Sequence, residues 1–256
     1  MSKKIYSYNV NGIRSALSKG LSDWIKFSSP DILCLQETKA DPSQIDVLLF
    51  ESLGYTCYIH SAEKKGYSGV MTLSKEPAQQ IIPGMGIEKY DTEGRVLRTD
   101  FKSFTLINVY IPSGTTGDIR QDFKMEFLND FRKYIQVLRK ERSRILICGD
   151  YNICHKPIDI NHPERHKNSS GFLPEERDWF DKYLSDGLID TFRIFTDQPN
   201  QYSWWSYRAN SRAKNLGWRI DYHVVSEDLK PMVKNASIMK DVNHSDHCPV
   251  SVTLDL

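Results

Sequence analysis

Short apolar runs without a polar face constrain the fold of this chain more than any other feature. The clearest run, in "DILCLQE" (residues 31–37), is apolar without interruption from Ile32 to Leu35. A run of this kind is typical of a strand that is buried on both faces of a sheet. Two further strands are expected in "FTLINVYIP" (104–112) and "RILICGD" (144–150). A chain with such strands needs further layers of structure to cover its sheets.

Amphipathic helical patterns alternate with the expected strands along the whole sequence. Residues 118–142 carry one apolar stripe with charges on the opposite face, which predicts a core-packed helix; its members are Phe123, Phe127, Phe131, Ile135 and Leu138. Shorter helices are expected within 20–29 and 174–187. No linker-like stretch divides the chain, so we predict one α/β domain over residues 1–256, with two facing mixed sheets and helices outside them.

Composition excludes several classes of protein. The five cysteines are odd in number and form no C-x-x-C pair, which argues against a disulfide scaffold and a thiolate zinc site. No apolar run is long enough to span a bilayer, and the N-terminus lacks a secretory signal, so we expect a soluble cytoplasmic protein. The formal net charge is +1, so a site for a polyanion would have to concentrate positive charge locally.

Polar side chains follow the carboxyl ends of the apolar runs. They are Asn9 and Asn11, Gln36 and Glu37, Tyr110, Asp150 and Asn152, and Asp246 with His247 before the last strand. Side chains two positions apart in an extended chain point to the same side. Each residue alone is more often a cap or turn residue, but five strand ends of this kind predict a site at one rim of the sheets.

These residue types suit phosphodiester hydrolysis. Carboxylate and amide oxygens match Mg²⁺ or Mn²⁺ better than zinc. A histidine and a tyrosine can donate hydrogen bonds to a phosphoryl oxygen, and an ionised aspartate can activate a water. No serine or cysteine stands in a recognisable nucleophile motif, so direct attack by water is the simpler hypothesis.

The cluster "NHSDHCPV" (243–250) could be a transition-metal site, an acid/base pair or a plain surface turn. Asp246 and His247 are adjacent, so they can face one site only if the segment is a loop, which Pro249 favours. We expect His244 on the surface and Cys248 as a buried thiol.

Several long motifs carry a resemblance to a known family. They include "PDILCLQETK" (30–39), "DTFRIFTDQPNQYSWW" (190–205) and "NLGWRIDYHVVS" (215–226), with shorter motifs around them in the same order. In these motifs the chain resembles the exonuclease III family of abasic-site (AP) endonucleases, within the DNase I-like metal-dependent phosphoesterases. The resemblance implies a four-layer α/β sandwich. It also implies Mg²⁺-dependent DNA repair by hydrolysis of the phosphodiester 5′ to an abasic site in double-stranded DNA. The products would be a 3′-hydroxyl and a 5′-deoxyribose phosphate, with 3′-phosphodiesterase and variable 3′→5′ exonuclease activity besides.

The resemblance also implies roles for single residues. The metal ligands would be Glu37, Asn9, Asn11 and Asp246. The attacking water would be positioned by Asp150 and Asn152. The scissile phosphate would be contacted by Tyr110 and His247, and Asp221 would hold the His247 ring. Some members carry aspartate where Asn11 stands, so Glu37 bears more of the metal's charge here. The family often has asparagine where Ser169 stands, so Ser169 is expected to contribute weakly.

The expected DNA side lies mainly in "SWWSYRANSRAKNLGWR" (203–219). Its tryptophans could equally be core residues, but the interleaved arginines favour a DNA face. The resemblance implies that Trp204 and Trp218 line a pocket for the abasic sugar, while Trp205 and Arg208 wedge into the duplex. Lys65 and Arg95 are further candidates for backbone contacts. The expected partner is double-stranded DNA with abasic sites or blocked 3′ ends. We expect the protein to act on it as a monomer, at the nucleoid.

Two other classes of function remain open. A phosphoinositide phosphatase or sphingomyelinase of similar architecture should show a basic amphipathic or hydrophobic loop near the site, and the sequence shows none. A catalytically dead DNA-binding module should have lost Glu37, Asp150 or His247, and all three are present.

Overall fold

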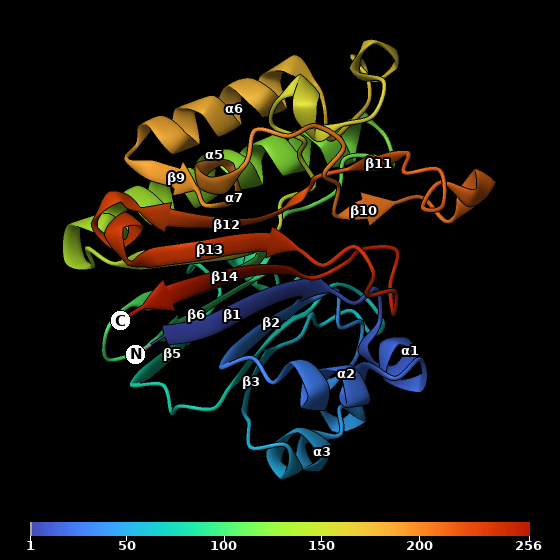
Figure 1. Ribbon diagram of the computed structural model, residues 1–256. Helices are drawn as coiled ribbons and strands as arrows, with labels where there is room; N and C mark the ends of the chain where they lie inside the picture. Colours follow the sequence, from blue (N-terminus) through green and yellow to red (C-terminus); the bar gives the residue numbers. More distant parts are fainter. Residues whose placement is uncertain (1) are drawn as a thin grey trace.

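Two six-stranded sheets face each other in the computed structural model, which describes residues 2–256 (Figure 1). The β1 sheet has the order β13 (Val233–Ile238), β14 (Val250–Asp255), β1 (Ser2–Asn9), β2 (Ile32–Gln36), β4 (Val70–Ser74), β3 (Thr56–His60). The β8 sheet has the order β5 (Gln80–Pro83), β6 (Val96–Asp100), β7 (Thr105–Tyr110), β8 (Ile145–Asp150), β12 (Asp221–Ser226), β9 (Leu188–Asp190). Both sheets are mixed, because β1 and β2 pair in parallel, as do β7 and β8, while the other pairs are antiparallel.

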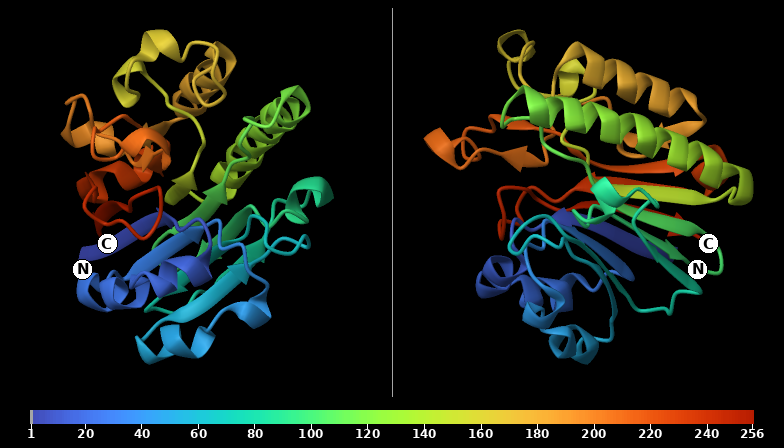
Figure 2. Two further views of the ribbon diagram at one scale, coloured as in Figure 1. Left: turned by 90° about the vertical axis from the view of Figure 1, so that its right-hand side faces the viewer. Right: turned by 180° about the vertical axis from the view of Figure 1, so that it is seen from behind.

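Helices cover the outer face of each sheet, which makes four layers (Figure 2). The β1 sheet is covered by α1 (Ile13–Ser18), α2 (Leu21–Ser28) and α3 (Val47–Ser52), and the β8 sheet by α5 (Asp118–Glu141) and α6 (Pro174–Ser185). Short helices α4 (Glu88–Asp91) and α7 (Phe192–Phe195) and a two-stranded ribbon of β10 (Trp204–Trp205) and β11 (Gly217–Trp218) complete the fold. The predicted four-layer α/β sandwich is confirmed. Across residues 2–256, no helix combines the length and the apolar character needed to cross a membrane.

Alternation along the strands decides which side chains lie between the sheets. In β8, Leu146 and Cys148 pack between the sheets, while Ile145 and Ile147 pack against the helices. The next interior-facing position of this strand is Asp150, because successive strand residues alternate between the two faces. The apolar layer between the sheets therefore ends in polar residues at one rim.

Polar side chains already replace apolar ones between the sheets just beneath that rim. The Gln36 side-chain nitrogen donates to Ser7 Oγ (3.0 Å) and to Asn108 Oδ1 (2.7 Å), and all three residues are fully buried between the two sheets. These hydrogen bonds satisfy polar groups that would otherwise cost free energy in the interior. They tie β1, β2 and β7 together beneath the site.

The predicted helix at 118–142 is confirmed as α5, and Phe127, Phe131, Ile135 and Leu138 are buried in the core of the β8 sheet. Lys124 is buried as well, although its charge suggested an exposed position. Its ammonium donates to Glu176 Oε1 (2.5 Å) and to the carbonyl of Asn152 (2.8 Å). Lys124 therefore ties α5 to α6 and to the loop that follows β8.

The burial of the α5 stripe gives a stability prediction. Phe131→Ala should lower the free energy of unfolding by about 3–5 kcal/mol, because it removes a fully buried aromatic ring and leaves a cavity. Val137→Ala, on the exposed side of the same helix, should change it by less than about 0.5 kcal/mol. Urea denaturation of both variants measures the difference, and equal effects would contradict the packing described here.

Candidate active site

A cavity of about 680 Å³ opens at the rim where the strands of both sheets end. Its lining includes most of the strand-end residues that the sequence singled out: Glu37, Tyr110, Asp150, Asn152, Asp246 and His247, together with Trp204, Trp218 and Ser169. The alternation described above explains this convergence for Tyr110 and Asp150, which end β7 and β8 at interior-facing positions. Glu37 follows β2 in a left-handed conformation (φ 51°), and Asp246 and His247 lie on the loop before β14. The predicted gathering of these residues is confirmed as geometry, while their chemical roles stay predictions.

Asn9 lies at the centre of the site and joins the two sheets. Its side-chain nitrogen donates to Glu37 Oε1 (2.8 Å) and to Asp150 Oδ2 (2.8 Å). Glu37 follows a strand of the β1 sheet and Asp150 ends a strand of the β8 sheet. The amide is fully buried, so one neutral donor bridges two carboxylates from opposite sheets.

The ends of β1 and β8 share one local structure. The backbone nitrogen of Asn11 donates to Asn9 Oδ1 (3.0 Å), and that of Asn152 donates to Asp150 Oδ1 (2.8 Å). Asn11 and Asn152 both adopt a left-handed conformation (φ 46° and 51°), which asparagine tolerates better than most residues. The same turn therefore closes the equivalent strand of each sheet. Asp150 and Asn152 line the cavity, whereas Asn9 and Asn11 lie outside its lining.

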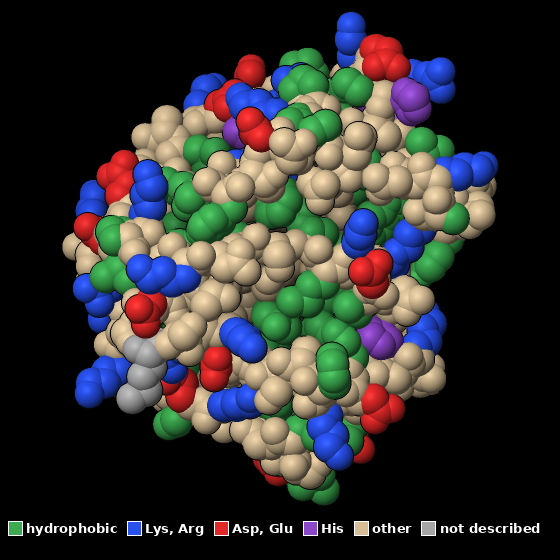
Figure 3. All heavy atoms as spheres, in the orientation of Figure 1, with side chains coloured by type: hydrophobic (Ala, Val, Ile, Leu, Met, Phe, Trp, Pro, Cys, Tyr) green, Lys and Arg blue, Asp and Glu red, His purple; other side chains and the backbone are tan. Residues whose placement is uncertain are grey.

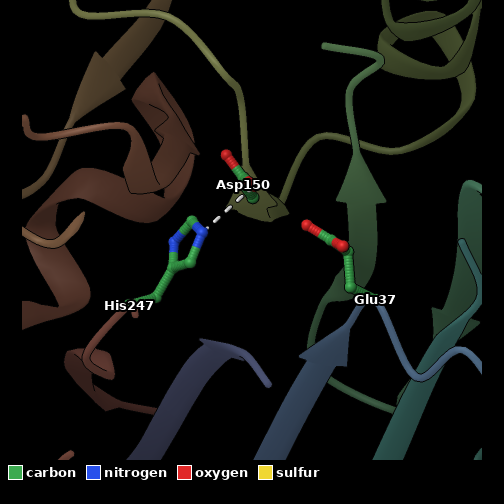
Figure 4. Close-up of side chains that lie close together, drawn as sticks. All are labelled: Glu37, Asp150 and His247. Atoms are coloured by element: carbon green, nitrogen blue, oxygen red, sulfur yellow. Dashed lines mark ion pairs between the residues drawn. The ribbon is translucent and has the colours of Figure 1, made fainter. Parts of the chain in front are cut away.

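One side-chain nitrogen or oxygen atom of each of Glu37, Asp150 and His247 lies within 4.8 Å of the others, and the carboxylates of this group could hold a metal ion. Figure 4 shows Glu37 and His247 pointing toward Asp150 from opposite sides. The Lys39 ammonium lies 2.7 Å from Glu37 Oε2 and 2.6 Å from Asn11 Oδ1, so these oxygens already surround a cation. The carboxylate and amide oxygens gathered here fit Mg²⁺ or Mn²⁺.

Sequence reasoning missed Lys39. The available signal was its position two residues after Glu37 in "QETK". Burial alone would raise the pKa of Glu37, but the charge of Lys39, with hydrogen bonds from Asn9 and Lys39, outweighs burial and lowers that pKa. Glu37 is therefore held as a carboxylate at neutral pH.

His247 is buried between acidic residues. Its Nδ1 lies 2.9 Å from Asp221 Oδ2, and its Nε2 lies 3.9 Å from Asp150 Oδ2. Burial would lower the pKa of this imidazole, but Asp221, followed by Asp150 and Asp246, outweighs burial and raises the pKa to about 10. The ring is therefore protonated at neutral pH, and it can donate from Nε2 into the cavity.

Burial raises the pKa of both Asp150 and Tyr110, with a different consequence for each. Burial, opposed by His247 and reinforced by Asp221 and Glu37, raises the pKa of Asp150 to about 7. Such a carboxyl group can exchange a proton near neutral pH, as a general base must. Burial, helped by the nearby Glu37, raises the pKa of Tyr110 well above its usual range, so its hydroxyl stays a neutral donor.

Asp246 lies beside the acidic group without joining it. Its Oδ1 accepts from Asn11 Nδ2 (2.9 Å) and its Oδ2 accepts from Trp204 Nε1 (3.0 Å). Its carboxylate is thus engaged by the β1 end and by the cavity wall. A metal role for Asp246 and Asn11 stays a prediction.

Trp204 and Trp218 form an apolar wall of the cavity. They pair across the β10–β11 ribbon with ring centroids 5.9 Å apart and planes at 84°. Both are partly buried, and with Ile220 they line the cavity beside His247. Ser169 lies in the same lining, with its Oγ 3.5 Å from His166 Nδ1.

Two predicted DNA contacts are wrong. Trp205 cannot wedge into a duplex, because it is only 3% exposed and its Nε1 donates to Asn215 Oδ1 (3.1 Å). Arg95 is only 2% exposed, pairs with Glu93 (2.5 Å), and has its guanidinium against the rings of Tyr67 and Tyr110. Arg95 therefore supports Tyr110 from behind instead of facing solvent.

The exposed part of the expected DNA side is smaller than the sequence suggested. Arg208 and Lys65 are exposed, as expected, and so is Tyr207 (66%), which sequence reasoning passed over. His244 was expected on the surface, but it is buried beside Tyr8 and Trp24. Cys248 is buried, as expected.

Comparisons with known proteins agree with this geometry. Residues 6–247 match the model of the Endonuclease/Exonuclease/phosphatase family. The chain is 41% identical to an exodeoxyribonuclease of Bacillus subtilis (99% of this chain, 100% of the relative) and 38% identical to the DNA repair nuclease APEX1 of Danio rerio (98% and 82%). A solved AP endonuclease of Archaeoglobus fulgidus superimposes with a TM-score of 0.92 at 29% identity, over 99% of this chain and 100% of that one.

The chain belongs to the endonuclease/exonuclease/phosphatase family. Within that family it falls in the group that contains exodeoxyribonucleases and AP endonucleases, to which it is similar over nearly its whole length.

The ion pair between His247 and Asp221 gives a prediction about protonation. Asp221→Asn removes the first of the negative charges that raise the pKa of His247, so that pKa should fall from about 10 towards or below its ordinary value of about 6.5. NMR titration of the His247 imidazole measures the change.

A matched control for that titration is Asp181→Asn. It removes a carboxylate that contacts His155 (2.7 Å) and should leave the His247 titration unchanged. A His247 pKa that stays near 10 in Asp221→Asn would show that Asp221 does not hold the proton.

Proposed function

We propose that this protein is a DNA-repair AP endonuclease. It would hydrolyse the phosphodiester 5′ to an abasic site in double-stranded DNA, leaving a 3′-hydroxyl and a 5′-deoxyribose phosphate. One observation carries the proposal: the group of Glu37, Asp150 and His247 lies in the same cavity as the Trp204–Trp218 wall. The relatives named exodeoxyribonuclease and DNA repair nuclease support it.

A divalent cation, Mg²⁺ with Mn²⁺ as a substitute, would be held by Glu37 with Asn9, Asn11 and Asp246 around it. Such an ion stabilises the negative charge that develops on a phosphoryl group during hydrolysis. The Lys39 ammonium between Glu37 and Asn11 supports the placement, because a cation is already favourable there.

The chain's own residues would divide the remaining work. Asp150 would take the proton of the attacking water, and Asn152 would hold the Asp150 carboxylate through its backbone nitrogen (2.8 Å) and side-chain nitrogen (3.3 Å). Protonated His247 and the neutral hydroxyl of Tyr110 would donate hydrogen bonds to the phosphoryl oxygens. Donors fixed before the reaction stabilise developing charge without reorganising.

The Trp204–Trp218 wall would select the substrate. An abasic sugar lacks a base, so it can leave the duplex at little cost and lie against this wall. Arg208, Tyr207 and Lys65 are exposed and would contact the flanking duplex. Acidic and basic side chains are interspersed over the face seen in Figure 3, so binding would rely on the groups near the cavity.

Blocked 3′ ends would be processed in the same cavity, which gives 3′-phosphodiesterase and 3′→5′ exonuclease activity of variable strength. A 3′ phosphatase from Neisseria, solved bound to a product DNA hairpin, superimposes with a TM-score of 0.92 at 25% identity and supports this activity. The protein would act as a monomer, in the cytoplasm at the nucleoid.

The assignment of Asp150 is tested with a duplex that carries one abasic analogue. Wild-type protein should cut it 5′ to the analogue with Mg²⁺ and not with EDTA. Asp150→Asn should lose about three or more powers of ten in turnover while its Kd for the duplex stays nearly unchanged, because only the general base is removed. Absence of Mg²⁺-dependent incision by the wild type would refute the proposed function, and full turnover of Asp150→Asn would refute the base.

The DNA-facing surface is tested separately by salt dependence. Arg208→Ala should raise the Kd for the abasic duplex and reduce the slope of log K against log salt by about one, if its guanidinium contacts a phosphate. Lys140→Ala, exposed at the far end of α5, should change neither quantity. Equal effects of the two variants in a fluorescence-anisotropy titration would place the duplex elsewhere.

A further inference from the structure

Two residues of the site, Asp246 and His247, stand on a segment without regular structure. Residues 239–249 connect β13 to β14 and form only turns, bends and one isolated bridge. A functional side chain keeps its geometry only if its support is rigid, and regular strands give that support to Asn9 and Asp150. The segment therefore needs contacts from outside to hold Asp246 and His247 in place.

Arg212 supplies three of these contacts. It lies between β10 and β11, on the loop 206–216 that also exposes Tyr207 and Arg208. One terminal nitrogen of its guanidinium donates to the carbonyl of Ser245 (3.0 Å), and the other donates to the carbonyls of Lys240 (2.8 Å) and Val242 (2.5 Å). The three carbonyls span the segment up to the residue before Asp246.

The guanidinium is itself held in place by an aromatic ring. Its central carbon lies 4.7 Å from the centre of the buried Trp205 ring, a distance at which cation and ring attract each other. The backbone nitrogen of Trp205 donates to the carbonyl of Asp246 (3.0 Å), and that of Cys248 donates to the carbonyl of Ser203 (2.7 Å). The segment is therefore joined, on both sides of His247, to β10 and to Ser203 directly before it.

We propose that Arg212 is a positioning residue: it fixes the 240–247 segment so that Asp246 and His247 face the cavity. It thereby links their placement to the loop 206–216. The inference about catalysis rests on the proposed function, whereas the inference about the segment's order does not. Arg212 therefore has a role inside the protein, although the arginines of residues 203–219 were expected to face DNA.

The chemistry of arginine explains why lysine would not serve. A planar guanidinium donates along fixed directions to several carbonyls at once and stacks on an indole, whereas an ammonium is a point charge on a flexible stem. Arg212→Lys therefore keeps the positive charge and loses the geometry. This substitution separates a positioning role from a purely electrostatic one.

The first test is hydrogen–deuterium exchange of the DNA-free protein. Arg212→Lys should speed exchange of the amides in 240–247 while those of β1 stay as slow as in the wild type. Lys240→Ala is the matched control: it removes a charge from the same segment and leaves the carbonyl that Arg212 contacts. Unchanged exchange in Arg212→Lys would overturn the proposal whether or not the protein cuts DNA.

The second test is kinetic and uses the abasic duplex. Arg212→Lys should lower kcat by about 10- to 100-fold, since small misplacements of reacting groups cost that much, with its Kd for DNA within about twofold of the wild type. Lys240→Ala should keep the wild-type kcat. A raised Kd with an unchanged kcat would show that Arg212 is a DNA contact and would overturn the positioning role. If Arg212→Lys does not fold, Arg212→Gln takes its place with the same expected results.

Discussion

The hydrogen bonds of the Asn9 amide are the interaction on which the site depends. Glu37 and Asp150 come from opposite sheets, and two carboxylates brought together in a buried place repel each other and lose hydration. Asn9 donates to both from a buried position, while Lys39 faces Glu37 on one side and His247 faces Asp150 on the other. The seam between the sheets can therefore hold an acidic site without an unpaired charge.

The same arrangement divides the roles of the titratable groups. Asp150 lies opposite Asp221 in the pairing of β8 and β12, and His247 contacts both of them. Two neighbouring carboxylates stabilise the protonated form of His247. The same crowding of acidic groups keeps Asp150 protonated until the pH approaches neutrality. One cavity thus contains a cationic donor and a base that ionises near neutral pH.

The sequence predicted the frame of this site well, because the frame follows from local patterns. Strand alternation and the polar residues at strand ends are visible over a few positions. They sufficed for two facing sheets with helices outside and for Asn9, Glu37, Asp150 and His247 as members of one rim, whereas the four-layer sandwich and the residue roles were implied by the family resemblance. Contacts such as Asn9 with Asp150, 141 positions apart, could be expected only as members of one rim.

The failures share one physical cause. Trp205, Arg95 and Arg212 look like DNA-binding residues by type, but each is engaged by groups remote in sequence: Asn215, the Tyr110 ring and the carbonyls of 240–245. Residue type does not reveal such partners.

The central claim is that strand ends of both sheets assemble one site for a phosphodiester beside an apolar pocket for a sugar. The most direct measurement is a crystal structure of Asp150→Asn with Mg²⁺ and a duplex that carries an abasic analogue. The account predicts the analogue's sugar against Trp204 and Trp218, with its 5′ phosphate within hydrogen-bond distance of His247 Nε2 and the Tyr110 hydroxyl. A duplex bound on another face, or a sugar held away from the two tryptophans, would contradict it.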